Sequence, residues 1–80
     1  MADGPLSHTA YRAVEKILLA ADERIHELTP FQRDFVDHNL TRLARFEERT
    51  RFSRPQIQIV VEIADFLDLD ASDLEEDDHA

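Results

Sequence analysis

The alternation of hydrophobic and polar positions along the chain predicts three helices. In the first, over about residues 8–28, apolar side chains recur at alternating intervals of three and four, which places them on one helical face. Charged residues fill the other faces, so this segment is expected to form one wall of a helical bundle. An intermolecular coiled coil stays open as the alternative, because the stripe extends over nearly three heptads. The stripe consists of Tyr11, Val14, Leu18, Ala21, Ile25 and Leu28.

The second helix is expected over about residues 30–49. Thr29 and Gln32 have the spacing of a capping box, with Pro30 at the first helical position, and this start also ends the preceding helix. The two helices are therefore expected to be joined by a tight turn. The residues predicted to point inward are Phe35, Val36, Leu40, Leu43 and Phe46, with Phe31 at the edge of the stripe.

The most apolar segment of the chain is expected to form the third helix, over about residues 54–68. Ser53 and Gln56 form a second capping box, with Pro55 in the first turn. At 100° per residue only a narrow arc of this helix is polar, so it must be covered on several sides. The segment is therefore expected to lie at the centre of the fold, wrapped by the other two helices. Whether a second copy of the chain adds to this cover, as in a homodimer, stays open.

Residues 57–63 also fit a half-buried β-strand, because β-branched residues alternate with polar ones. The capping box, the absence of a glycine turn and the absence of a second strand-like run favour the helix. The predicted fold is all-α: a compact three-helix bundle over residues 7–69. A flexible leader is expected at residues 1–6, and an acidic C-terminal tail at residues 70–80.

Length and composition limit the remaining possibilities. The 80 residues suffice for one domain, and the absence of cysteine excludes disulfides and thiolate metal sites. No apolar run approaches the length of about 20 residues that crosses a membrane, and no basic region precedes an apolar one at the N-terminus. A cytoplasmic protein of the host cell, without membrane attachment, is expected.

The excess negative charge is concentrated at the C-terminal end. The formal net charge is −9, and the last sixteen residues contain eight acidic residues and no Lys or Arg. Clustered carboxylates speed association with basic surfaces, although such runs also serve solubility alone. The tail is expected to be frayed and solvated, with a short turn capped by Ser72 as the alternative. The residues predicted to bind a partner are Asp65, Asp68, Asp70, Asp73, Glu75 and Glu76.

A row of basic residues on the second helix is the secondary candidate for a binding surface. Arg42, Arg45 and Arg49 share one helical face, and they could bind nucleic acid or a partner protein. Pairing with acidic residues of the same chain is the other explanation. The exposed face of the third helix carries mainly Gln and acidic residues, and the acidic residues repel phosphate. Direct nucleic-acid binding is therefore not expected.

No pattern of catalytic residues is present. The sequence has no glycine-rich phosphate loop, no cysteine nucleophile and no serine with a plausible histidine partner. The four histidines are not at the spacing of metal ligands, and the acidic run lacks the order of an EF-hand loop. The protein is therefore not expected to be an enzyme, and no catalytic residue, cofactor or metal site is predicted.

Two segments carry a resemblance to known proteins. Leu28-Thr29-Pro30-Phe31-Gln32-Arg33-Asp34-Phe35-Val36, and Phe52-Ser53-Arg54-Pro55-Gln56 with the apolar positions after it, resemble a pattern in small helical proteins encoded by phages and prophages. The chain departs from that pattern at Phe52, where leucine is usual. Its small size, acidity and lack of cysteine are also similar in profile to anti-CRISPR inhibitors.

That resemblance implies a function, although it supplies no site residues. A protein of this profile would bind a host nucleic-acid-handling complex stoichiometrically, such as a type I CRISPR effector, and block its basic DNA- or RNA-binding surface. The alternative is a small regulator or adaptor that binds nucleic acid or a partner through Arg42, Arg45 and Arg49.

Overall fold

The computed structural model describes residues 4–5, 7–72 and 74, with Gly4, Pro5 and Glu48 described in their backbone alone. It contains three α-helices: α1 (His8–Glu23), α2 (Pro30–Phe46) and α3 (Arg54–Phe66). Two short 3-10 helices, η1 (Ile25–Glu27) and η2 (Glu47–Arg49), follow α1 and α2. The predicted all-α three-helix bundle is confirmed, and the strand considered for residues 57–63 is wrong, because these residues lie within α3.

Both predicted capping boxes are present, and they explain where α2 and α3 begin. The Thr29 hydroxyl accepts a hydrogen bond from the Gln32 backbone N–H at 3.2 Å, and the Gln32 side chain accepts one from the Thr29 N–H at 3.0 Å. Ser53 and Gln56 repeat the arrangement at 3.3 and 2.7 Å. Each box satisfies backbone donors that the first helical turn would otherwise leave unpaired.

The helix ends are set by local backbone geometry that the hydrophobic pattern does not show. Each predicted range contains one α-helix, but α1, α2 and α3 end at Glu23, Phe46 and Phe66, before the ranges end. Two described non-glycine residues have a positive φ, and each lies just after a helix. Glu47 follows α2 with φ 51°, and Asp68 follows α3 with φ 61°. A positive φ cannot continue a right-handed helix, so the chain turns at these residues.

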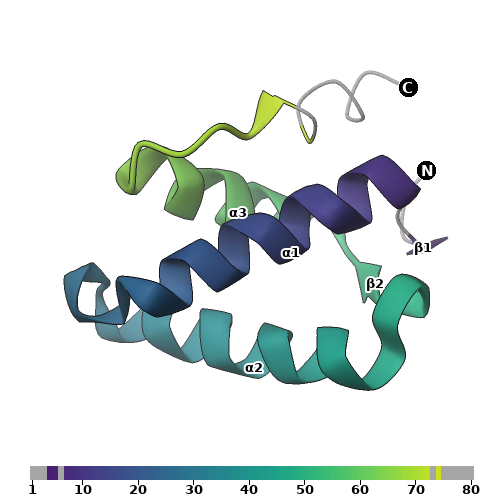
Figure 1. Cartoon of the computed structure of the whole chain (residues 1–80), viewed down its shortest axis with the longest axis horizontal. Coiled ribbons are helices and arrows are strands. Elements are labelled where there is room, and N and C mark those ends of the chain that lie inside the picture. Colours follow the sequence, from purple (N-terminus) through teal and green to yellow (C-terminus); the bar gives the residue numbers. More distant parts are fainter. Residues whose placement is uncertain (1–3, 6, 73, 75–80) are drawn as a thin grey trace.

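The central helix is α1, and the prediction that the third helix occupies the centre is wrong. Figure 1 shows α1 crossing the molecule between α2 and α3, and it packs against both. Its inward side chains, among them Val14 and Leu18, are fully buried. Phe66 of α3 is 55% exposed, so α3 lies against the core on one side and is not covered on several sides as predicted.

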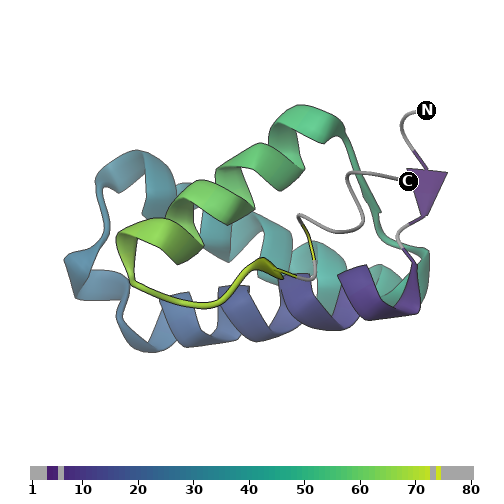
Figure 2. The ribbon, with the colours of Figure 1, turned by 90° about the horizontal axis from the view of Figure 1, so that it is seen from above.

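The segment after α3 reaches back to the core at Leu74, so the solvated tail expected at residues 70–80 does not begin at residue 70. In Figures 1 and 2 the chain reverses after α3 and returns beside α1. The Leu74 side chain is only 2% exposed, and Leu69 and Ala71 pack against the core. Residues 75–80 of the predicted tail lie outside the described residues. The folded unit therefore extends at least to Leu74.

The inward face of α2 differs from the prediction at two positions. Phe46 is 45% exposed because it is the last residue of the helix, where the chain turns away. Asn39 is buried instead, and its amide nitrogen donates to the Phe35 carbonyl oxygen at 2.9 Å. The hydrogen bond allows a polar side chain to occupy a core position.

Part of the predicted leader pairs with the loop before α3. Strand β1 (Gly4–Pro5) lies antiparallel to strand β2 (Arg51–Phe52), with Gly4 opposite Phe52 and Pro5 opposite Arg51. The other leader residues, 1–3 and 6, lie outside the described residues. The pairing places the start of the chain beside the connection between α2 and α3.

Candidate functional site

The end of α3 and the segment after it form an acidic surface. Asp65, Asp68 and Asp70 are exposed there, whereas the other predicted partner-binding residues, Asp73, Glu75 and Glu76, lie outside the described residues. Asp65 and Glu62 border a shallow depression of about 330 Å³, which we call the acidic hollow. The residues that line the acidic hollow are Gln58, Val61, Glu62, Asp65, Leu69 and Ala71.

A Schellman turn at the end of α3 builds this hollow. The Leu69 backbone N–H donates to the Ala64 carbonyl oxygen at 2.6 Å, and the Asp68 N–H donates to the Asp65 carbonyl oxygen at 3.1 Å. This pair of bonds, with positive φ at Asp68, closes the helix and reverses the chain. Leu69 and Ala71 thereby line the hollow together with Val61, next to the carboxylates of α3.

The Asp70 carboxylate is hydrogen-bonded to the backbone two residues later. Its Oδ1 accepts a hydrogen bond from the Ser72 N–H at 3.0 Å. Hydrogen bonding by Ser72 lowers the pKa of Asp70 below its ordinary value, which favours the charged form. The sequence indicated Ser72 as the capping side chain, but in this contact the Asp70 side chain caps the Ser72 backbone.

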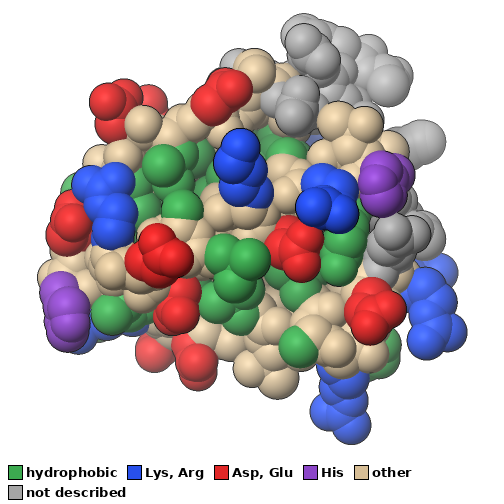
Figure 3. Space-filling model, viewed as in Figure 1, with side chains coloured by type: hydrophobic (Ala, Val, Ile, Leu, Met, Phe, Trp, Pro, Cys, Tyr) green, Lys and Arg blue, Asp and Glu red, His purple; other side chains and the backbone are tan. Residues whose placement is uncertain are grey.

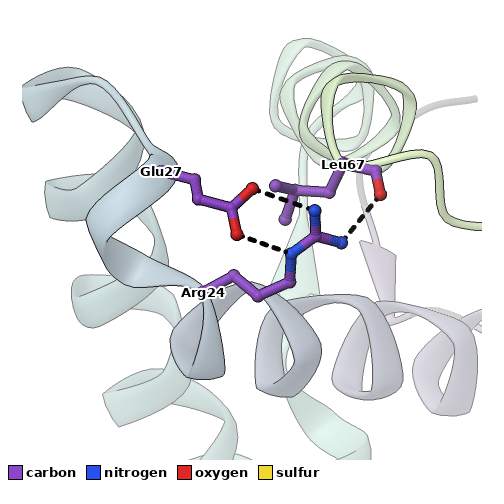
Figure 4. Close-up of polar contacts among 3 residues, drawn as sticks. All are labelled: Arg24, Glu27 and Leu67. Carbon is purple, nitrogen blue, oxygen red and sulfur yellow. Dashed lines mark hydrogen bonds and ion pairs between the residues drawn. The ribbon is translucent and has the colours of Figure 1, made fainter.

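Arg24 fixes the acidic end of α3 to the end of α1, as Figure 4 shows. Its Nη1 donates to the Leu67 carbonyl oxygen at 2.9 Å, and its Nε and Nη2 donate to the two carboxylate oxygens of Glu27 at 3.1 and 2.9 Å. The hydrogen bond with Glu27 raises the pKa of Arg24, and the same bond lowers the pKa of Glu27. Arg24 was not among the sequence candidates, since the Leu67 carbonyl is remote in sequence.

The predicted row of arginines is divided by the fold. Arg42 donates from Nη1 to Asn39 Oδ1 at 2.7 Å and from Nη2 to the Arg51 carbonyl oxygen. Its guanidinium carbon also lies 5.1 Å from the centre of the Phe52 ring. Arg42 therefore joins α2 to β2, and of the predicted row only Arg45 and Arg49 line a common depression.

Arg45 and Arg49 share a depression with a residue of α1 that was not a binding candidate in the sequence analysis. Together with Arg12 they line a depression of about 480 Å³ between the start of α1 and the end of α2, which we call the basic hollow. Arg12 is far from them in sequence, and only the antiparallel packing of the two helices brings it there. The lining residues are Tyr11, Arg12, Glu15, Arg45, Phe46, Glu47 and Arg49.

The two hollows lie at opposite ends of the molecule. The acidic hollow is near the end of α3, and the basic hollow is where α1 begins and α2 ends. In Figure 3, acidic side chains stand at the upper left over the end of α3, and basic side chains project at the right and lower right near the end of α2. Basic side chains also appear at the left of this face and acidic ones at the right, so the difference in charge belongs to the two hollows and not to whole ends of the molecule.

The described part of the chain lacks two further kinds of feature. Among these residues no group of three or more His, Asp or Glu side chains is placed to hold a metal ion. No helix among them has the length and apolar character needed to cross a membrane. Comparison of the chain with protein-family models, with curated proteins and with solved structures finds no match.

Proposed function

We propose that the protein is a stoichiometric binding protein that docks its acidic hollow on a basic surface of a partner protein. The observation that carries this proposal is one hollow lined both by the apolar side chains of Val61, Leu69 and Ala71 and by the carboxylates of Glu62 and Asp65. Protein interfaces commonly have this composition, in which an apolar centre is surrounded by polar groups.

The surroundings of the acidic hollow support a larger contact. A stable interface covers about 800 Å² on each partner, which is more than one shallow depression provides. Asp68 and Asp70 are exposed in the segment that follows α3, and the Phe66 ring next to Asp65 is largely exposed. These residues supply further charge and apolar area, of the kind found at binding hot spots.

The charge of this surface indicates the class of partner. A surface that binds DNA or RNA is positively charged, and a carboxylate cluster is attracted to it as phosphates are. The partner we propose is therefore a host nucleic-acid-handling complex, whose basic surface the protein blocks. A phage-type inhibitor of a type I CRISPR effector, similar to the anti-CRISPR proteins, is the specific form of this proposal.

The experiment measures DNA binding by a purified type I effector while increasing amounts of the protein are added. We expect DNA retardation to disappear at about equal molar amounts of protein and effector. The variant Glu62→Gln/Asp65→Asn should require at least about tenfold more protein, because two charged contacts at the hollow are lost. The matched control is Asp34→Asn/Asp37→Asn, which removes the same charge from exposed positions on α2 and should act as the native protein does.

Two results would count against the proposal at different levels. Full DNA binding in a large excess of the protein would rule out this effector as the partner. A parallel affinity capture from the host compares the native chain with Glu62→Gln/Asp65→Asn. If both retain the same host proteins with equal yield, the acidic hollow is not the docking surface.

A second candidate function is a small regulator that binds a partner or nucleic acid through the arginines of α2. Arg45 and Arg49 carry this candidate, since Arg42 is engaged with Asn39 and β2. Loss of a retarded nucleic-acid complex in Arg45→Ala/Arg49→Ala, together with steep weakening by salt, would support it.

A further inference from the structure

Three arginines from three different elements line the basic hollow. Arg12 comes from α1, Arg45 from α2 and Arg49 from η2. At this hollow Arg12 Nε lies 3.6 Å from Glu15 Oε1, which is a long distance for an ion pair. A guanidinium group can donate two parallel N–H···O hydrogen bonds to a phosphate. A hollow lined by three arginines is therefore suited to an oxyanion.

An aromatic side chain stands beside these arginines. Phe46 lines the same hollow and is 45% exposed, although the sequence pattern predicts an inward position for it. An exposed ring next to arginines offers a stacking surface for a nucleobase. The hollow therefore has separate places for an anionic and a planar group.

The acidic residues of the hollow limit the charge of the ligand. Glu15 and Glu47 line it together with the arginines, so the hollow has only a small net positive charge. Three arginines against two carboxylates leave charge for one phosphate inside the hollow, and the carboxylate oxygens can accept hydrogen bonds from sugar hydroxyls or from an amino group. A ligand with one phosphate fits this set of groups best.

The rim of the hollow is held in an unusual backbone conformation. Glu47 has φ 51° and ψ −128°, a region that glycine favours. The buried Thr50 maintains it, because its N–H and its hydroxyl both donate to the Glu47 carbonyl oxygen, at 3.0 and 2.7 Å. This turn keeps both Glu47 and Arg49 at the hollow, and strained backbone of this kind is concentrated at functional sites.

From these observations we infer that the basic hollow binds a nucleoside monophosphate, with the phosphate on Arg12, Arg45 and Arg49 and the base on Phe46. Its volume of about 480 Å³ lies within the range of small-molecule sites. The ligand is either a free nucleotide or the phosphorylated end of a nucleic-acid strand, since both present the same groups. This inference does not depend on the acidic hollow, which lies at the other end of the molecule.

The test is a titration of the full ¹⁵N-labelled chain, followed by the backbone amide signals in NMR spectra. Three probes separate the parts of the ligand: AMP, ribose 5-phosphate without a base, and adenosine without a phosphate. We expect AMP to shift the amides of Arg12, Arg45 and Arg49 at the lowest concentration. Ribose 5-phosphate should bind about tenfold more weakly, because the stacked base is lost, and adenosine more weakly still.

Variants assign the binding to individual side chains. Arg45→Ala/Arg49→Ala should weaken AMP binding at least about tenfold, since two charged hydrogen-bonding groups are removed. Phe46→Ala should weaken AMP binding about tenfold while binding of ribose 5-phosphate changes less than about twofold. Arg51→Ala is the matched control, because Arg51 is exposed and does not line the hollow, and it should bind AMP as the native chain does. Circular dichroism confirms that each variant is folded.

Short oligonucleotides with and without a 5′-phosphate distinguish the two sources of the ligand. Tighter binding of the phosphorylated strand than of AMP would assign the site to strand ends, and the reverse would assign it to a free nucleotide. The inference is overturned if millimolar AMP leaves the amides of the hollow unshifted. It is equally overturned if Arg45→Ala/Arg49→Ala binds AMP as tightly as Arg51→Ala.

Discussion

At the scale of single residues, the turn after α3 has a residue with a strained backbone conformation at a position where glycine is usual. Asp68 has φ 61° and occupies the position of a Schellman turn that glycine most often fills. We expect Asp68→Gly to stabilise the protein by about 0.5–1 kcal/mol, because glycine adopts this conformation without a steric cost. Urea denaturation followed by circular dichroism measures the change.

Asp65→Gly is the control for that substitution. Asp65 lies within α3, where glycine should destabilise by about 0.5 kcal/mol relative to an ordinary helical residue, so the two changes should have opposite signs. Equal destabilisation by both variants would mean that the Asp68 backbone is not under strain.

Residues whose roles depend on near neighbours could be predicted, and residues with distant partners could not. Thr29 and Ser53 were predicted as caps because each bonds to a residue three positions later. The roles of Arg24 and Arg42 were missed or misassigned, since their acceptors include the carbonyl oxygens of Leu67 and Arg51. A periodic pattern shows the face on which an arginine lies, but not the acceptor that the fold brings to it.

At the scale of the elements, the segment that follows α3 is expected to be required for folding. Leu74 is 2% exposed and belongs to the same core as the helices. We expect Leu74→Ala to destabilise the protein by about 2–4 kcal/mol, the usual cost of such a cavity in a core. Thermal and urea denaturation measure the change, and a cost below about 0.5 kcal/mol would place Leu74 outside the core.

The same segment shows why composition misled the sequence prediction. Acidic residues dominate positions 70–80, and this charge indicated a solvated tail. Leu74 nevertheless lies in the core, with Leu69 and Ala71 packed against it, because the turn at Asp68 directs the chain back along α1. A deletion that tests the acidic end without unfolding the protein must therefore begin after Leu74.

At the scale of the whole molecule, the topology determines the two surfaces and the centre of the fold. The acidic excess at the C-terminal end was predictable from the sequence, but the meeting of Arg12 with Arg45 and Arg49 was not, since it requires the antiparallel packing of α1 and α2. The most apolar segment was expected at the centre, yet α1 holds this place. Its position between α2 and α3 follows from the packing of all three helices, which the hydrophobicity of one segment does not reveal.

The central position of α1 leads to an expectation about cooperativity. Because α1 packs against both α2 and α3, a cavity within it should weaken both contacts together. Leu18 is fully buried and its neighbour Leu19 is 50% exposed, so the same substitution can be compared at adjacent positions of one helix. We expect Leu18→Ala to cost about 3 kcal/mol and Leu19→Ala less than about 0.5 kcal/mol.

Hydrogen exchange in Leu18→Ala should show amides of α2 and α3 losing protection by the same free energy, since small domains open as one unit. Unchanged protection in α3 alone would mean that α3 does not depend on α1, and that the bundle has two independent parts.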